Sequence, residues 1–187
     1  YSAEGKLLAI EGLEEGLQRQ WVALEDVPAH TLRIFIAAED RRFYRHWGID
    51  ALAVLRSAYI NLRSGSVKSG ASTIGMQLAR IIHGKKTGLS AEARLNAKAG
   101  LALKAGEAFR AVQLQALRGK KGVLEAWLNC LPFGSNIEGL ASIAQRRFSC
   151  KPQALGIEQS LLLALIPRSP SHYDFFYEKN RERAVAA

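Results

Sequence analysis

The sequence predicts a mainly α-helical protein with a short β-hairpin near its N-terminus. Two observations support this fold class: residues that favour helix starts precede a series of apolar or amphipathic stretches, and turns that contain glycine follow several of them. The chain has 187 residues, of which 48% are hydrophobic, so it can bury one substantial core, or one core with a small side lobe. We therefore expect a single domain over residues 1–187.

The first 25 residues contain the candidate hairpin. Its two candidate strands are Lys6–Ile10 and Gln20–Leu24, with a glycine-rich turn between them. The segment lacks a signal-peptide pattern, and the chain contains no run of about 18 apolar residues. We therefore expect no membrane-spanning segment within this sequence.

Helices are expected to fill the rest of the chain. Their expected ranges are 26–39, 51–63, 72–83, 90–118, 122–131, 137–148 and 157–166. Asp50, Ser72 or Thr73, and Ser90 are the candidate caps of the second, third and fourth of these helices. Gly106 weakens the fourth helix; it leaves room either for a close approach of backbone or ligand, or for simple helix packing.

The net charge of +9 predicts an anionic partner. Basic residues are scattered over many segments, which favours a lined cleft or a broad face, and no nucleic-acid recognition motif accompanies them. We interpret Cys130 and Cys150 as buried free thiols, with pairing in an oxidising compartment as the alternative. The four histidines show no zinc-binding spacing, so no metal ligand is assigned.

The most informative segment is 37–48, which reads Ala-Ala-Glu-Asp-Arg-Arg-Phe-Tyr-Arg-His-Trp-Gly. The apolar helical residues before it would carry Glu39 to the edge of packed protein, where partial desolvation makes a carboxylate a better proton acceptor. Glu39 is therefore the first candidate for a general base. Compensating surface charge at a helix end is the alternative interpretation.

A second segment, 69–80, reads Ser-Gly-Ala-Ser-Thr-Ile-Gly-Met-Gln-Leu-Ala-Arg. Small residues and two hydroxyls open a helix that carries Gln77 and Arg80. Backbone amides and hydroxyls at a helix start bind anions well. The segment is therefore a candidate anion-binding element.

These two segments resemble the peptidoglycan glycosyltransferases of glycosyltransferase family 51, which occur alone or as the first domain of class A penicillin-binding proteins. The family pattern Glu-Asp-x-x-Phe-x-x-His-x-Gly is matched at Glu39, Asp40, Phe43, His46 and Gly48. The pattern Gly-x-Ser-Thr-x-x-Gln-Gln is matched at Gly70, Ser72, Thr73 and Gln77, with Met76 in the place of the first Gln. Ala71 and Met76 look most like the 1C branch.

The resemblance continues along nearly the whole chain. Lys104 and Glu107 match the family's Arg-Lys-x-x-Glu, with Leu103 in the place of Arg, and residues 124–129 are similar to Leu-Glu-x-Tyr-Leu-Asn. The resemblance implies a lysozyme-like helical domain with a larger head lobe and a small membrane-proximal lobe. Family members normally carry an N-terminal membrane helix, so we interpret residues 1–25 as a hairpin and linker that follow an anchor absent from this chain.

The resemblance also implies an activity: polymerisation of lipid II into β-1,4 glycan chains with release of polyprenyl diphosphate and inversion at the anomeric carbon. Glu39 would take the proton of the acceptor hydroxyl. Cationic side chains, with or without a divalent ion (Mg²⁺ or Mn²⁺), would stabilise the leaving diphosphate. Arg80 and Lys104 are the expected cations, and Glu107 would hold them in place or share the ion.

Further residues are candidates for the substrate side of the same site. Ser72, Thr73 and Gln77 would hydrogen-bond phosphate or sugar oxygens, and Lys98 or Arg94 would supply a further family cation. Arg56 would add positive charge, with plain surface placement as an equal alternative. Asp40 would orient a neighbouring cation or shape the loop.

The expected partners are lipid II, the growing glycan chain, a membrane surface and cell-wall synthesis proteins, with no nucleic acid. The expected location is the extracytoplasmic face of the bacterial cytoplasmic membrane, on the periplasmic side. Two alternatives remain open: a non-catalytic module that binds lipid II or glycan, and a lysozyme-like muramidase in which Glu39 and Glu107 serve as the two carboxylates.

Overall fold

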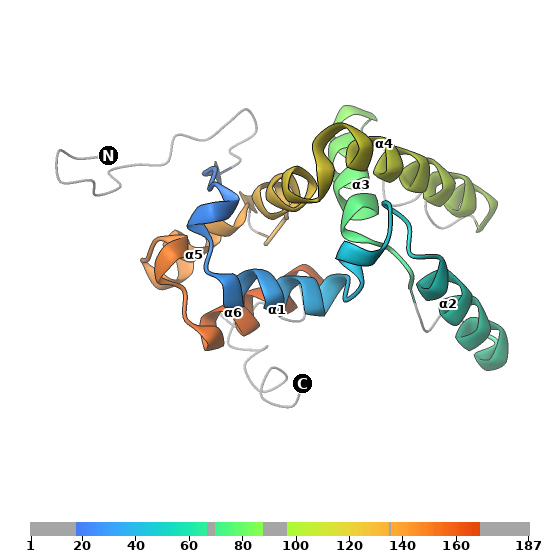
Figure 1. Ribbon diagram of the computed structural model, residues 1–187, viewed down its shortest axis with the longest axis horizontal. Helices are drawn as coiled ribbons and strands as arrows, with labels where there is room; N and C mark the ends of the chain where they lie inside the picture. Colours follow the sequence, from blue (N-terminus) through green and yellow to red (C-terminus); the bar gives the residue numbers. More distant parts are fainter. Residues whose placement is uncertain (1–17, 67–69, 88–96, 135, 169–187) are drawn as a thin grey trace. The chain divides into compact units, whose positions relative to one another are not determined.

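The computed structural model describes residues 18–66, 70–87, 97–134 and 136–168, and within these ranges it is mainly α-helical, as predicted (Figure 1). The α-helices are α1 (Ala29–Glu39), α2 (Ala51–Ser64), α3 (Ile74–Thr87), α4 (Ala97–Cys130), α5 (Leu140–Phe148) and α6 (Ile157–Leu165). The short elements are the strands β1 (Gln18–Arg19) and β2 (Ile137–Glu138) and the 3-10 turns η2 (Leu24–Asp26), η3 (Phe43–Arg45), η5 (Pro152–Ala154) and η6 (Ile166–Arg168).

The chain divides into two compact units. The central unit is Glu39–Trp127, and the terminal unit contains the described residues up to Ala38 and from Leu128 onwards. The expectation of one domain stays a prediction. No helix among the described residues is long and apolar enough to cross a membrane.

The predicted N-terminal hairpin is wrong in its second strand. Residues 20–23 are irregular, and Leu24 begins η2. The backbone amides of Gln20 and Val22 donate to the side chains of Ser142 and Asn129, so no partner strand is needed to satisfy them. β1 lies just before this segment and pairs in parallel with β2. The other predicted strand, Lys6–Ile10, lies outside the described residues.

Local signals located several helix ends correctly. The Asp50 carboxylate accepts from the amide of Ala53 at 3.0 Å and caps α2, and Gly65 ends α2 in the left-handed conformation with a φ of 62°. The Thr73 hydroxyl accepts from the amide of Met76 at 3.2 Å and caps α3. These signals are reliable because they depend on neighbours within one helical turn.

Other boundaries differ from the prediction. α3 continues past Gly84 to Thr87, and the helix expected from Ile137 begins at Leu140 because the first two residues form β2. The two helices expected over 90–118 and 122–131 are joined in α4, with one non-helical residue at Gly119, whose φ is 64°. The helix start predicted at Ser90 lies outside the described residues.

Each unit has its own buried core. In the central unit the fully buried large side chains are Phe43, Ile74, Leu78, Leu124 and Trp127. In the terminal unit they are Phe35, Leu128, Phe133, Leu140, Ile143, Leu155 and Leu163. Within the terminal unit, the Thr31 hydroxyl of α1 is 2.9 Å from that of Ser160 on α6, which fixes these two helices side by side. Cys130 and Cys150 form no disulfide in the described part of the chain, as predicted, but both are half-buried and not buried as expected.

Candidate active site

Glu39 is held by a short chain of hydrogen bonds inside the central unit. Gln77 Nε2 on α3 donates to Glu39 Oε2 at 2.8 Å, and the indole nitrogen of Trp127 donates to Gln77 Oε1 at 3.1 Å. An indole nitrogen can only donate, so the carboxamide oxygen of Gln77 must face it and the amide nitrogen must face Glu39. Trp127 is fully buried, and it therefore fixes the orientation of the group that aims the carboxylate.

The loop after Glu39 is fastened to the start of α3. Asp40 is buried; its Oδ2 accepts from the backbone amide of Ile74 at 3.1 Å, and both its oxygens lie 3.0 Å from His46 Nε2. The Thr73 hydroxyl donates to the carbonyl of Gly48 at 2.5 Å. Asp40 and Thr73, both candidates for substrate contact, thus use their polar atoms to hold the loop against α3.

Gly48 is required where the loop passes α4. Its φ is +91°, and a Cβ there would lie 2.8 Å from the carbonyl carbon of Ala111. Neither a left-handed backbone nor so close a backbone neighbour suits a side chain. The glycine of the first motif therefore permits the loop to rest directly on the helix.

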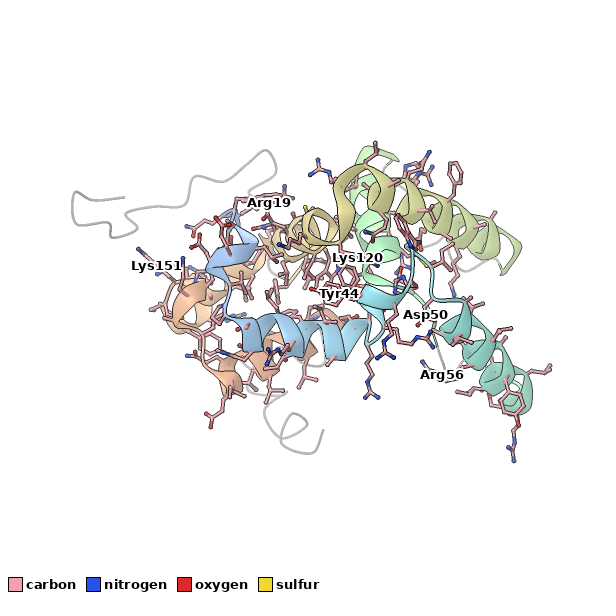
Figure 2. All side chains as sticks on the ribbon, viewed as in Figure 1. Arg19, Tyr44, Asp50, Arg56, Lys120 and Lys151 are labelled. Atoms are coloured by element: carbon pink, nitrogen blue, oxygen red, sulfur yellow. The ribbon has the colours of Figure 1, made fainter. Side chains whose placement is uncertain are left out.

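Lys120 is a functional candidate that the sequence analysis missed. Its ammonium group donates to the carbonyls of Phe43 and His46 and lies 4.4 Å from the centre of the Phe43 ring (Figure 2). Burial lowers the pKa of Lys120 from its usual value, and the nearby charge of Asp40 opposes this shift. The only signal in the sequence was that Lys120 directly follows Gly119. Its partners, Phe43 and His46, are 77 and 74 residues away, so no local pattern identifies them.

Arg80 and Glu107 form a two-point ion pair between α3 and α4. Arg80 Nε and Nη2 each donate to one Glu107 oxygen at 2.7 Å, and Nη2 also lies 3.3 Å from the Ser72 hydroxyl. Hydrogen bonding to Glu107 raises the pKa of Arg80 above its usual value, although burial opposes it. Arg80 is therefore a permanently charged group of fixed orientation.

A small pocket lies beside this ion pair. Its volume is about 170 Å³, and its lining is Arg80, Gly100, Leu103, Lys104 and Glu107. Lys104 is exposed, so its ammonium group is available to a ligand. Leu103 gives the pocket an apolar wall at the position where the resembled motif has Arg.

The remaining candidates are less closely connected to these groups. Arg56 is exposed on α2 (Figure 2), and Lys98 lies in the first turn of α4, where its side chain is outside the described part. Arg94 lies outside the described residues. At Gly106 a Cβ would lie 2.9 Å from the guanidinium of Arg110, so this glycine makes room for a side chain of its own helix.

The side chains near Arg80 do not supply enough ligands for a divalent ion to be held by the protein alone. Both oxygens of Glu107 accept from Arg80. Across the described ranges, no three His, Cys, Asp or Glu side chains are grouped so that they could hold a metal ion.

α3 connects the two polar groups. Gln77, which binds Glu39, and Arg80, which binds Glu107, are three residues apart on this helix and therefore lie on one face. Gln77, which holds Glu39, and Arg80, which holds Glu107, are thus within about one helical turn of each other along α3.

The sequence is similar to known proteins over most of its length. Residues 5–187 match the transglycosylase family. The chain is 33% identical over 181 residues to penicillin-binding protein 1A of Aquifex aeolicus, 35% over 174 residues to that of Neisseria gonorrhoeae, and 34% over 186 residues to that of Escherichia coli. These alignments cover 97%, 93% and 100% of the chain but only 23%, 20% and 20% of the relatives.

These relatives bear the 1A name, so the resemblance to the 1C branch stays a prediction. The family match covers both segments that carry the resemblance; Glu39, Gln77 and Arg80 come from these segments, and Glu107 comes from α4. The chain belongs to the transglycosylase family, and it is related to part of the penicillin-binding proteins 1A.

Proposed function

We propose that this domain polymerises lipid II into β-1,4 glycan chains with Glu39 as the general base. The observation that carries the proposal is the α3 face on which Gln77 binds Glu39 and Arg80 binds Glu107. A carboxylate base and a fixed cation held by one helix suit a reaction in which one oxygen loses a proton while another leaves with negative charge.

Glu39 acts on the acceptor sugar. Its carboxylate takes the proton of the 4-hydroxyl while that oxygen attacks the anomeric carbon of the donor. The bond from this carbon to the diphosphate breaks on the opposite face, so the configuration inverts and no covalent enzyme intermediate forms. Gln77 donates to one oxygen of Glu39 and orients the carboxylate for this transfer.

The pocket beside Arg80 receives the diphosphate. Arg80 and Lys104 supply positive charge, and Ser72 adds a hydroxyl next to the guanidinium. Glu107 is a positioning residue here, because both its oxygens are used to hold Arg80. Lys98 and Arg56 are peripheral sources of positive charge.

We also propose that α2 rests on a membrane surface at the extracytoplasmic face of the cytoplasmic membrane. Leu52, Leu55, Tyr59 and Leu62 are between 55% and 86% exposed and recur at helical spacing. Arg56 and Arg63 add positive charge on the same helix, as in interfacial helices that bind anionic lipids. Leu55→Glu combined with Leu62→Glu should release the protein from anionic vesicles in a sedimentation assay; unchanged binding would rule out this role for α2.

The activity is tested with purified protein and lipid II in detergent, with Mg²⁺, Mn²⁺ or a chelator. Glu39→Gln should lower the rate of chain formation by about 10²-fold or more. Glu158→Gln, which changes an exposed carboxylate at the start of α6, is the matched control and should leave the rate unchanged.

Two outcomes would replace the proposal. Binding of lipid II by the wild-type protein without any polymer under every metal condition would indicate a non-catalytic binding module. Shortening of preformed glycan chains would indicate a muramidase.

A further inference from the structure

The terminal unit contains a pocket that has no part in the site around Glu39. Its volume is about 280 Å³, and its polar and aromatic lining includes Gln20, Trp21, Asp26, Gln145, Lys151 and Gln153. Lys151, labelled in Figure 2, lies between α5 and η5. The pocket therefore combines three carboxamides, one indole, one carboxylate and one ammonium group.

Trp21 is presented to this pocket by fixed neighbours. The amide of Gln20 donates to the Ser142 hydroxyl at 2.7 Å, and Val22 exchanges two hydrogen bonds of 2.8 Å with the Asn129 carboxamide. Asn129 and Ser142 are fully buried. The backbone on both sides of the indole is thus anchored in the core.

The anchoring decides which side chain faces outwards. Val22 is buried, whereas its neighbour Trp21 is largely exposed, so the anchored backbone leaves the indole accessible at the surface. Trp21 is 55% exposed, which is unusual for a tryptophan next to a buried backbone. A large aromatic face in a preformed position is suited to contact a ligand with little loss of conformational entropy.

The lining favours a sugar over other ligands. Carboxamides both donate and accept hydrogen bonds, as hydroxyl and acetamido groups require, and an indole face packs against the carbon–hydrogen face of a pyranose. The lining carries one positive and one negative side chain, Lys151 and Asp26, so its net charge does not favour a phosphate. Its polar groups also make it unsuitable for a lipid chain.

We propose that the pocket lined by Trp21 and Gln153 binds one N-acetylated pyranose residue of a glycan strand. The choice of a glycan strand rests on the proposed function, whereas the preference for a sugar rests on the lining alone. All the pocket residues belong to the terminal unit, whereas Glu39 belongs to the central unit, and no chemical step is assigned to the bound sugar residue.

Cys150 provides a probe, because this residue also lines the pocket. The test follows alkylation of Cys150 by iodoacetamide in a Cys130→Ala background, with and without N-acetylglucosamine tetramer. A second arm uses lipid-free disaccharide chains from peptidoglycan, which distinguishes a plain N-acetylglucosamine site from one that needs the muramyl unit. Burial raises the pKa of the Cys150 thiol, so the reaction is run at about pH 9 to generate thiolate.

At a sugar concentration about ten times the Kd, alkylation should slow about tenfold, because the bound fraction protects the thiol. Trp21→Ala should weaken protection by at least about threefold, and Gln153→Ala, which changes an exposed side chain, should weaken it as well. Trp47→Ala is the matched control, since Trp47 is exposed in the central unit, and it should leave protection unchanged.

Glu39→Gln separates this proposal from the proposed function. Protection that persists in an inactive Glu39→Gln protein supports the pocket, and loss of polymerisation alone does not affect it. Equal alkylation rates with and without both sugars would overturn the proposal. So would protection that survives both Trp21→Ala and Gln153→Ala.

Discussion

Replacement of Gly48 by alanine tests how the first motif is held against α4. The added Cβ would lie 2.8 Å from the Ala111 carbonyl carbon, 2.9 Å from its oxygen and 2.9 Å from the amide nitrogen of Val112. All three are backbone atoms of a helix, so they cannot rotate away as a side chain would. The loop that follows Glu39 or the helix must shift instead.

Two costs add together in this variant. A positive φ disfavours alanine by about 1–2 kcal/mol, and forced contact in packed protein costs about 1–3 kcal/mol. The total is therefore about 2–5 kcal/mol. A chain of this size loses about 2–4 °C in Tm per kcal/mol, so the midpoint should fall by about 10 °C.

Thermal unfolding followed by circular dichroism measures this effect, and Gly65→Ala is the matched control. Gly65 also has a positive φ, of 62°, but a Cβ added there would meet no neighbouring atom within 4 Å. Gly65→Ala should therefore lower the Tm by only about 2–8 °C. If the two variants lose equal stability, the close contact with Ala111 is not a constraint and the reasoning is refuted.

Three further predictions concern side chains that contribute to the stability or the activity of the protein. Lys120→Met leaves two carbonyls without their donor and should lower the free energy of unfolding by about 2–4 kcal/mol. Lys121→Met, at an exposed neighbour, should change it by less than about 0.5 kcal/mol. Equal losses in denaturant titrations would show that the hydrogen bonds of Lys120 to the Phe43 and His46 carbonyls do not stabilise the protein. Arg80→Lys keeps the charge but loses the two-point bond to Glu107, so kcat for polymerisation should fall about tenfold or more, while the exposed Arg118→Lys should not change it; an unchanged kcat for Arg80→Lys would exclude the fixed guanidinium as a requirement. Asn129→Ala removes both hydrogen bonds to Val22 and should lower the free energy of unfolding by about 2–4 kcal/mol in calorimetry; a loss below about 1 kcal/mol would show that water replaces the carboxamide.

The sequence was a good guide to features that depend on near neighbours. Asp50, Gly65 and Thr73 were recognisable as helix ends because a cap satisfies backbone groups within one turn. It failed for residues 20–24, whose apolar and aromatic character resembles a strand. Side chains of Ser142 and Asn129 satisfy that backbone, and no local pattern reveals partners more than 100 residues away.

In the candidate site, too, the sequence indicated the local features but not the contacts between distant residues. The motifs identified Glu39, Gln77, Arg80 and Glu107 as residue types suited to proton transfer and to binding of an anion. The resemblance also implied that Glu107 holds a cation in place, and Glu107 accepts two hydrogen bonds from Arg80. The sequence positions did not indicate that Gln77 would bind Glu39. These pairings depend on how α3 packs against its neighbours in the central unit.

By itself, then, the sequence determined the helical class, most helix ends and the chemical composition of the site, because helix formation and residue chemistry are local properties. Only the tertiary structure decided the parallel pairing of β1 with β2, the clamp that Lys120 makes on the loop after Glu39, and the anchoring of Trp21 beside its pocket. Each of these joins segments far apart in the chain, and such contacts form only when packing brings the partners within hydrogen-bonding distance.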